Sequence, residues 1–338
     1  MTPTLALLLT LGMASANTPP VVIPTRFEAD RVFALPRTRS GETIRFFTDS
    51  GGGGNLLCRS AADRLHLKPT PIPPDPELEG ELGKNLGTIS LPAFAPGAGV
   101  PANANGDAKL LVNDCAMGSA AMKASFGEGL LSSRWFDGRV WTWDYPGHTL
   151  TLHGSRWKPD PLAQRTPIGF RKASGNSPAF AMPRITITID GQALDMLLDT
   201  GATGHPTPAG QDAQGGESVA GARATSFITT SVMNRWHAAH PDWTLIADGD
   251  DLFAPRMTAR IIRVPELSIA GITVGPVWFT ERADRNFRQM MSSMTDRPVE
   301  GAIGGNALNH FAMTIDYPAN AAYFRCTRDC KATPPPAP

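Results

Sequence analysis

Apolar and polar residues alternate along short stretches of this chain, as they do in strands that bury one face. In residues 180–191 the side chains of Ile185, Ile187 and Ile189 alternate with polar neighbours, and this period of two predicts a β-strand. Residues 138–152 also favour strands, whereas 59–66 and 230–240 are the better candidates for short helices. The pattern predicts an all-β chain with a few short helices.

Two of the strand-like stretches end in an acid that is followed by a hydroxyl residue and a glycine. Residues 195–204 read D-M-L-L-D-T-G-A-T-G, so an apolar run leads directly to Asp199. Residues 44–53 read I-R-F-F-T-D-S-G-G-G and carry Asp49 in the same place, 150 residues earlier. A carboxylate directly after an apolar strand is badly placed for a solvated loop, and we expect each strand to carry its acid into a cleft.

A second pair of motifs repeats in the same order. T-W-D-Y-P at 142–146 corresponds to T-I-D-Y-P at 314–318. Gly129 lies 15 residues before Asp144, and Gly301 lies 15 residues before Asp316. Two motifs repeated in one order and with one spacing predict an internal duplication of about half the chain.

With these motifs, the chain resembles a two-lobed aspartic protease in which each half is similar to the bacterial retroviral-type (retropepsin-like) domain. The likeness covers roughly 27–153 and 178–325 and is clearest over residues 301–324, G-A-I-G-G-N-A-L-N-H-F-A-M-T-I-D-Y-P-A-N-A-A-Y-F. It implies a pepsin-like or retropepsin-like acid protease fold with pseudo-twofold symmetry. It also implies a monomer whose two lobes imitate a dimer.

The resemblance assigns a role to each motif residue. The expected catalytic pair is Asp49 and Asp199, with one acid supplied by each lobe. The residues expected to support the two loops are Ser50, Gly51, Thr200 and Gly201. The glycines expected on the strand that crosses beneath each loop are Gly129, Gly301 and Gly304.

Two neighbouring carboxylates have a chemistry of their own. They cannot both ionise readily, so the pair holds one proton over a wide pH range. The ionised acid then accepts a proton from water, while the protonated acid hydrogen-bonds the carbonyl of a peptide. The expected activity is therefore an endopeptidase that acts on peptides or proteins and needs no cofactor or metal.

The chain is expected to divide into five parts. They are a signal peptide (1–16), an N-terminal protease lobe (17–153), an interlobe connector (154–177), a C-terminal protease lobe (178–325) and a disordered tail that carries a disulfide (326–338). The connector is inferred from the proline and glycine residues that recur along it, because these residues interrupt helices and strands.

The first residues indicate export. An apolar run from Leu5 to Met13 ends at Ala14-Ser15-Ala16, a small-residue cleavage pattern. No Lys or Arg precedes the run, and a buried N-terminal strand or helix is the alternative. The run is shorter than the about 20 residues that a spanning helix needs. We expect cleavage after Ala16 and a periplasmic or extracellular protein with no membrane span.

The four cysteines fit such a compartment. An even number of cysteines in an exported chain favours two disulfides. Cys326 and Cys330 lie close together in R-C-T-R-D-C and are expected to pair, which leaves Cys58 for Cys115. Free thiols or a zinc site are the alternatives, but no C-x-x-C occurs.

Charge and remaining motifs exclude other classes of protein. The 31 basic and 31 acidic residues balance without a block of like charge, which argues against nucleic acid as a partner. The glycines after Asp49 do not form a phosphate loop, because no Gly-Lys-Ser/Thr follows. No Gly-x-Ser-x-Gly supports a serine hydrolase.

Lobe one departs from the family pattern. Gly52 and Gly53 stand where larger or hydroxyl residues are usual, and the crossing strand ends in Ser132 instead of glycine. The tyrosines are Tyr145, Tyr317 and Tyr323, and none lies in the segments expected to act as flaps, 83–106 and 215–224. A catalytically inactive protein that binds peptides in the same cleft is therefore the alternative function.

Overall fold

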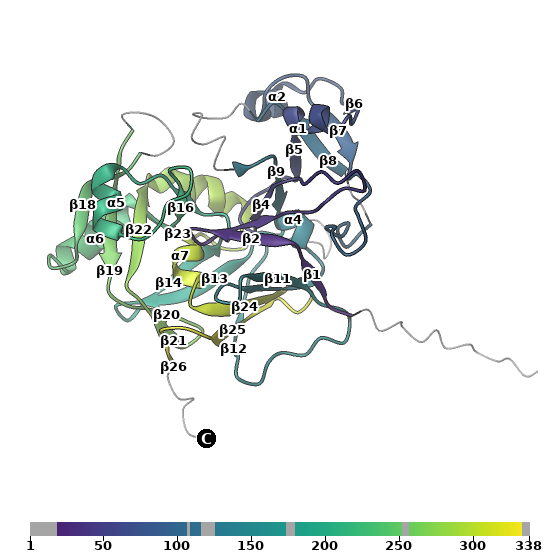
Figure 1. The fold of residues 1–338 in the computed structure, drawn as a ribbon. Coiled ribbons are helices and arrows are strands. Elements are labelled where there is room, and N and C mark those ends of the chain that lie inside the picture. The colour runs from purple at the N-terminus through teal and green to yellow at the C-terminus, as the bar shows by residue number, and fades with distance from the viewer. Residues whose placement is uncertain (1–18, 107–108, 116–125, 174–179, 252–256, 333–338) are drawn as a thin grey trace, which may run out of the picture.

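The computed structural model describes residues 19–106, 109–115, 126–173, 180–251 and 257–332. Strands dominate these residues and form three large sheets and one small one (Figure 1). The predicted all-β, two-lobed fold with few helices is confirmed. The signal peptide predicted at 1–16 lies outside the described residues.

Lobe one is built on an eight-stranded sheet in the order β2-β3-β4-β9-β5-β8-β7-β6. These strands are β2 (Thr25–Glu28), β3 (Arg31–Ala34), β4 (Phe46–Asp49), β9 (Gly129–Ser132), β5 (Leu56–Cys58), β8 (Lys109–Asn113), β7 (Gly87–Ser90) and β6 (Thr70–Pro71).

Lobe two is built on a ten-stranded sheet in the order β18-β19-β22-β17-β23-β14-β13-β20-β21-β26. These strands are β18 (Leu245–Asp250), β19 (Ala259–Val264), β22 (Val277–Arg282), β17 (Ser226–Thr229), β23 (Gly301–Ile303), β14 (Gln192–Leu198), β13 (Arg184–Ile189), β20 (Leu267–Ile269), β21 (Ile272–Val274) and β26 (Lys331–Ala332).

The two sheets share a run of strands in the same order. Lobe one has β3-β4-β9-β5-β8-β7-β6, and lobe two has β13-β14-β23-β17-β22-β19-β18. Each pairing has the same sense in both runs. The acid-bearing strand is parallel to the crossing strand in each lobe, β4 to β9 and β14 to β23. The crossing strand is antiparallel to β5 in one lobe and to β17 in the other. The duplication read from the motifs is thus a duplication of topology.

A six-stranded sheet joins the lobes. Strands of lobe one lie on one side of its centre, and strands of lobe two lie on the other side. Its order is β1-β11-β10-β24-β25-β12. At the centre Thr142 pairs with Thr314, the first residues of the two repeated motifs, and their hydroxyl oxygens lie 2.6 Å apart. The pseudo-twofold axis therefore passes between them. The strands are β1 (Val21–Ile23), β11 (Thr149–Leu152), β10 (Val140–Asp144), β24 (Phe311–Asp316), β25 (Ala321–Cys326) and β12 (Gln164–Pro167).

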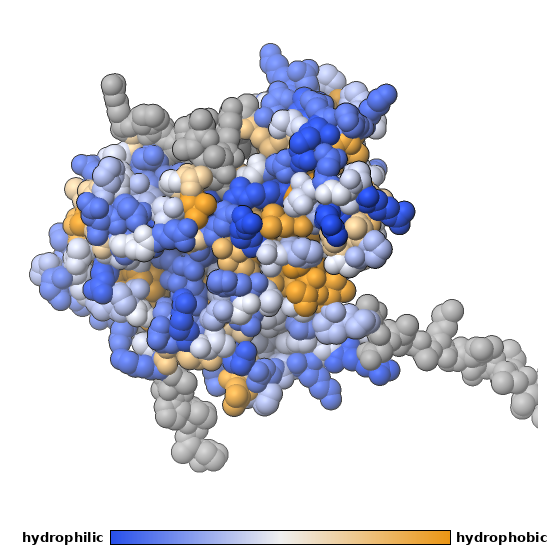
Figure 2. Space-filling view, viewed as in Figure 1, coloured by the Kyte–Doolittle hydropathy of each residue, from blue (hydrophilic) through white to orange (hydrophobic). Residues whose placement is uncertain are grey.

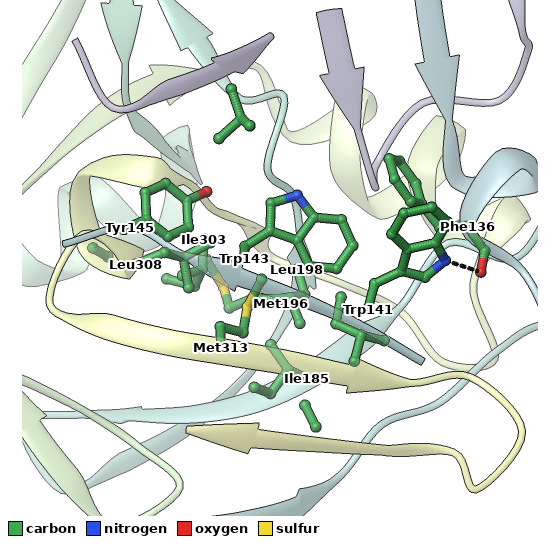
Figure 3. Packing of buried hydrophobic residues seen from close by; sticks show 14 of the residues in the cluster. Phe136, Trp141, Trp143, Tyr145, Ile185, Met196, Leu198, Ile303, Leu308 and Met313 are labelled. Carbon is green, nitrogen blue, oxygen red and sulfur yellow. Dashed lines mark hydrogen bonds between the residues drawn. The ribbon is translucent and has the colours of Figure 1, made fainter. Parts of the chain in front are cut away.

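The alternation in the sequence decides which faces are buried. In β13 the side chains of Ile185, Ile187 and Ile189 are buried and Thr186 and Thr188 are exposed. In β10 the buried residues are Trp141 and Trp143, which pack edge-to-face on Phe136 at 5.1 and 5.0 Å (Figure 3). These rings fill the space between the joining sheet and the loops above it.

Helices are short and lie mainly at strand ends. The helices predicted at 59–66 and 230–240 are confirmed as α1 and α6, and α6 buries Val232, Met233 and Trp236. The helical elements are α1 (Arg59–Arg64), α2 (Pro76–Leu82), α4 (Ser133–Phe136), α5 (Pro208–Gln214), α6 (Thr230–Ala239), η1 (Arg285–Met290), η2 (Met291–Met294) and α7 (Gly305–Leu308).

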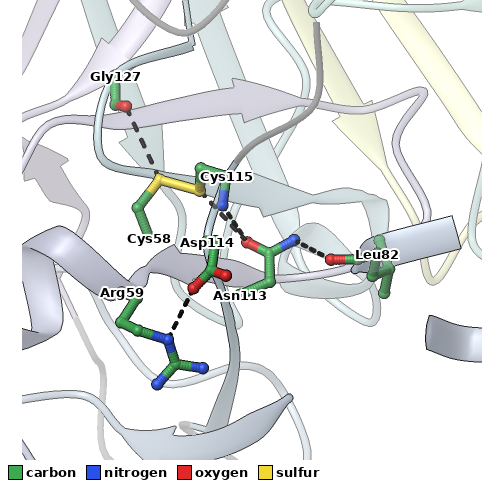
Figure 4. Close-up of a disulfide and its surroundings, with 7 residues drawn as sticks. All are labelled: Cys58, Arg59, Leu82, Asn113, Asp114, Cys115 and Gly127. Atoms are coloured by element: carbon green, nitrogen blue, oxygen red, sulfur yellow. Dashed lines mark hydrogen bonds and ion pairs between the residues drawn. A yellow bond between two sulfur atoms is a disulfide. The ribbon is translucent and has the colours of Figure 1, made fainter. Parts of the chain in front are cut away.

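Both predicted disulfides are confirmed. Cys58 is joined to Cys115, and Cys326 to Cys330. Beside the first bridge, the side chain of Asn113 accepts a hydrogen bond from the backbone of Cys115 at 3.1 Å and donates one to Leu82 at 3.2 Å (Figure 4). The bridge therefore fixes the end of β8 against the start of α1.

Two of the predicted segments, the connector and the tail, contain strands in the structure. The tail expected to be disordered from 326 is ordered as far as 332, because Lys331 and Ala332 form β26 and pair with β21. The residues beyond 332 lie outside the described residues. The connector expected at 154–177 contains β12, which pairs with β25 and closes the joining sheet. Both segments gain order from a free strand edge that the local sequence does not reveal.

Polar residues cover most of the face shown in Figure 2, and apolar side chains gather in small patches. One patch lies where Figure 1 labels β1, whose Val21 and Val22 are 40% and 58% exposed. In the described part of the chain, no helix is long and apolar enough to cross a membrane.

Candidate functional site

The structure brings the two Asp-Ser/Thr-Gly loops together at the junction of the lobes. Asp49 is the last residue of β4, and Asp199 directly follows β14. The apolar residues before each acid are buried in the core of their lobe, which anchors the strand. The repeat also keeps its register, since Phe47 pairs with Leu130 and the equivalent Leu197 pairs with Ala302. Equivalent strands therefore deliver equivalent acids.

The hydroxyls of Ser50 and Thr200 tie each loop to the other. The Ser50 hydroxyl donates to the Leu198 carbonyl at 2.7 Å and accepts from the Thr200 backbone N–H at 3.0 Å. The Thr200 hydroxyl accepts from the Ser50 N–H at 3.1 Å. Both side chains are fully buried, so these bonds are shielded from water. The loop-supporting role expected of Ser50 and Thr200 matches this geometry.

Each glycine of the motifs lies against the acid of the other lobe. A Cβ on Gly51 would lie 2.5 Å from Cγ of Asp199, and one on Gly201 would lie 2.3 Å from Cγ of Asp49. Real Cβ atoms do not approach other atoms so closely, so any larger residue would push the acids apart. Glycine is needed here to let the carboxyl groups approach.

The two carboxyl groups interact directly and are held by backbone N–H groups. The N–H of Gly51 donates to Asp49 and the N–H of Gly201 donates to Asp199, both at 2.8 Å. A hydrogen bond also links the two side chains. Both acids remain partly exposed although Ser50 and Thr200 beside them are buried. The residues beneath the acids are thus closed to solvent, while the acid residues themselves are not.

Burial and mutual repulsion shift the titration of the pair. Burial raises the pKa of Asp49, and the hydrogen bonds from Asp199, Gly51 and Gly52 oppose that rise. Burial raises the pKa of Asp199 well above its usual range, and the charge of Asp49 raises it further. The arrangement favours one charged and one protonated acid, so the pair shares a single proton.

The crossing-strand glycines lie where backbones touch. A Cβ on Gly129 would lie 2.5 Å from the Leu56 carbonyl oxygen, and one on Gly301 would lie 2.0 Å from that of Phe227. At Gly304 the added atom would lie 1.8 Å from the Thr225 oxygen. Glycine at these positions allows each crossing strand to pack closely against its neighbour, β5 in lobe one and β17 in lobe two.

Gly52 and Ser132, two of the departures from the family pattern in lobe one, lie next to one another. A Cβ on Gly52 would lie 3.3 Å from Cβ of Ser132 and 2.7 Å from Oδ2 of Asp49. A side chain at residue 52 would therefore meet Asp49 first and Ser132 second. Glycine at position 52 avoids both contacts.

Two supporting residues escaped the sequence analysis. The Asn55 side chain accepts the backbone N–H of Ser132 at 2.8 Å. In lobe two the Ser226 hydroxyl accepts the N–H of Gly304 at 3.1 Å. These bonds are equivalent, but lobe two inserts β15 (Thr203–Gly204), α5 and β16 (Arg223–Ala224) before Ser226. The insertion changes the spacing, so no repeat signal pointed to them.

The segments expected to act as flaps lie near the surface of each lobe. Residues 83–106 contain β7 and a loop that packs on 37–39, where the Arg37 N–H donates to Ala98 at 2.7 Å. Residues 215–224 follow α5 and end in β16. No tyrosine lies in either segment.

Tyr145 and Tyr317 are buried instead beneath the site. Burial raises the pKa of each well above its usual range, and nearby carboxylates add to this effect, Asp30 and Asp199 for Tyr145 and Asp137 and Asp49 for Tyr317. Both phenols are neutral and belong to the core (Figure 3 shows Tyr145).

An apolar cluster adjoins the lobe-two loop. Met182, Ala202 and Phe227 pack together in it, and a Cβ on Gly53 of lobe one would lie 3.5 Å from Cε of Met182. Its other buried members are Leu197, Phe287, Val299 and Ala302, and its partly buried members are Phe180, Met291 and Met294. The cluster reaches the acid loop through Leu197 and Ala202, and its partly exposed members extend its apolar surface.

Within the five described ranges, no group of three or more histidine, cysteine, aspartate or glutamate side chains is placed to hold a metal ion.

Comparisons with known proteins add little to this geometry. No family model matches the chain, and no curated protein matches it. Among solved structures, the crystal structure of basic 7S globulin from soybean is similar, with a TM-score of 0.45 and 10% sequence identity. The likeness covers 91% of this chain and 95% of the soybean chain.

Proposed function

We propose that the protein is an aspartic endopeptidase in which Asp49 and Asp199 activate water to hydrolyse peptide bonds. The observation that carries the proposal is the pair of hydrogen-bonded, partly exposed carboxyl groups, each packed against the glycine of the opposite loop. A structural ion pair would need an opposite charge, whereas two acids in contact favour a shared proton.

The reaction follows from the protonation states. Asp49, whose ionised form is favoured by hydrogen bonds from Asp199, Gly51 and Gly52, accepts a proton from the bound water as the water oxygen attacks the carbonyl carbon. The protonated Asp199 donates a hydrogen bond to the carbonyl oxygen, and a tetrahedral diol forms. Proton transfer to the nitrogen then breaks the C–N bond. The hydroxyls of Ser50 and Thr200 keep the two acids in register throughout.

Substrate and setting are part of the proposal. The apolar cluster beside Asp199, with Met291 and Met294 partly exposed, favours an apolar side chain next to the cleaved bond. The two disulfides support export, with the leader at 1–16 as the signal peptide. We assign the lobes to one duplicated retroviral-type unit, an assignment supported by the shared strand order, and expect a monomer.

Cleavage of a fluorogenic peptide library between about pH 3 and pH 7 tests this function. We expect cleavage that is favoured at acidic pH and inhibited by a statine-type mimic of the diol. A protein that binds library peptides but cleaves none at any pH would instead be the inactive peptide-binding form of this fold.

A further inference from the structure

A pocket of about 530 Å³ lies on the outer face of the sheet that joins the lobes. Because side chains alternate along β10, Thr142 and Asp144 face this pocket while Trp141 and Trp143 face the core. None of the residues that line the pocket belongs to the two acid loops. Its chemistry is therefore separate from that of the proposed protease site.

The floor of the pocket is a chain of hydrogen-bonding groups. The Thr142 hydroxyl lies 2.6 Å from the Thr314 hydroxyl and 2.7 Å from Nε2 of His153. Thr314 is buried and His153 is about half-buried. Burial lowers the pKa of His153, which makes its imidazole neutral near pH 7. The floor thus offers neutral donors and acceptors.

Two aromatic rings form a wall. Trp157 and Tyr323 meet edge-to-face with their centroids 5.3 Å apart, and Trp157 also lies 5.7 Å from the His153 ring. Both Trp157 and Tyr323 are partly exposed. Aromatic rings that keep an open surface in a pocket offer apolar contact with a polar edge.

Charged groups of both signs complete the lining. Asp144 and Asp160 are balanced by Lys158 and Arg325, and Arg325 contacts Asp160 at 3.3 Å. The lining therefore has no excess of either charge and gives no preference for an anion or a cation. The lining places carboxylate acceptors next to the ammonium and guanidinium donors of Lys158 and Arg325.

The pocket is not a by-product of the duplication. In the aligned T-W-D-Y-P and T-I-D-Y-P repeats, Tyr323 corresponds to Thr151 and Arg325 corresponds to His153. The tryptophan comes from the residues that follow lobe one and has no counterpart after lobe two. The sheet is nearly symmetric, but the ring of Tyr323, the charge of Arg325 and the segment that carries Trp157 have no equivalents in the other repeat.

We propose that this pocket binds a neutral saccharide unit. Adjacent sugar hydroxyls can each donate to a carboxylate and accept from an ammonium or guanidinium group, which is the pairing that this lining provides. The C–H face of a sugar ring fits an aromatic wall. A pocket of this size that has an aromatic wall and a few polar groups is typical of a site for a small ligand. This binding is independent of the proposed peptidase activity and would attach the protein to a glycan.

Titration calorimetry and ligand-observed saturation-transfer NMR with maltose, cellobiose, lactose and N,N′-diacetylchitobiose test the proposal on the full chain. We expect at least one of them to bind with a Kd of about 10 mM or tighter. Trp157→Ala should weaken that binding at least about tenfold, because the ring wall is lost. Lys158→Gln, at an exposed position, should weaken it while keeping the wall.

Trp278→Ala, which removes a partly exposed ring that lines another pocket, is the matched control and should leave binding unchanged. Circular dichroism and peptide cleavage by the variants separate lost binding from lost folding. Absence of binding by all four sugars would overturn the proposal. So would binding that Trp157→Ala and Lys158→Gln leave intact, or a preference for inorganic phosphate over every sugar.

Discussion

At the scale of single residues, the carboxyl pair decides whether the protein turns over substrate. Asp49→Asn and Asp199→Asn should each lower kcat by at least about 10³-fold, because either change removes the state with one charged and one protonated acid. Ser50→Ala leaves both acids in place and should reduce activity much less. Cleavage of a fluorogenic peptide by each purified variant measures this. Near-normal activity of Asp49→Asn would show that lobe one does not supply the second acid.

The same pair should make the folding stability of the protein fall as the pH rises. The pKa of Asp199 in the folded chain lies above its ordinary value of 3.8, so the folded state binds more protons than the unfolded state just above that pH. Stability linked to Asp199 is therefore present below the unfolded pKa and is lost as the pH rises through the folded pKa.

Asp199→Asn removes this loss because the amide does not ionise. We expect its melting temperature to exceed that of the wild type by an amount that grows as the pH rises from acidic to neutral. Asp242→Asn changes an exposed acid and should show no such trend in the same thermal scans. A constant difference between Asp199→Asn and the wild type would contradict the assigned shift.

At the scale of elements, the crossing strands depend on glycine for their close approach. Gly304→Ala should destabilise the fold by about 1–3 kcal/mol or more, because its Cβ would overlap the Thr225 carbonyl oxygen. Gly54→Ala is the matched control, since nothing lies within 4 Å of its Cβ position. Urea unfolding of both variants tests the difference, and equal midpoints would refute it.

The two disulfides should contribute unequally. In the chain-entropy model, the bridge between Cys58 and Cys115 contributes about 4 kcal/mol and the short loop of Cys326–Cys330 about 2 kcal/mol, because more residues are constrained by the first. The paired Cys→Ala variants should therefore differ in melting temperature, with the lower value for the Cys58/Cys115 pair. The reverse order would show that the C-terminal bridge has the greater structural role.

At the scale of the whole molecule, the lobes are joined by more than a linker. They share the six-stranded sheet, and the turn between β2 and β3 inserts into lobe two, where the side chain of Asn309 donates to Asp30 at 2.8 Å. The buried Arg31 reaches the Val219 carbonyl at 3.0 Å. These contacts oppose independent unfolding of one lobe.

We therefore expect a single cooperative thermal transition. Differential scanning calorimetry of the full chain should give a calorimetric enthalpy equal to the van't Hoff enthalpy. Two resolved transitions, each assigned to one lobe by limited proteolysis, would show that the joining sheet does not couple them.

The sequence by itself determined the features that repeat at a fixed local spacing. Alternation predicted the strands around Ile185 and Trp141, and two copies of acid, hydroxyl and glycine predicted the pairing of Asp49 with Asp199. These signals are readable because each lies within one short segment.

Only the tertiary structure decided the features that depend on distances between segments. Asn55 and Ser226 hold equivalent positions at different spacings, and Gly52 lies where a side chain would meet Asp49 and Ser132. The order of the tail depends on the free edge of β21, and the raised pKa of Asp199 depends on burial beside Asp49. Packing volume, strand edges and burial are properties of the assembled chain, and for that reason no local pattern contains them.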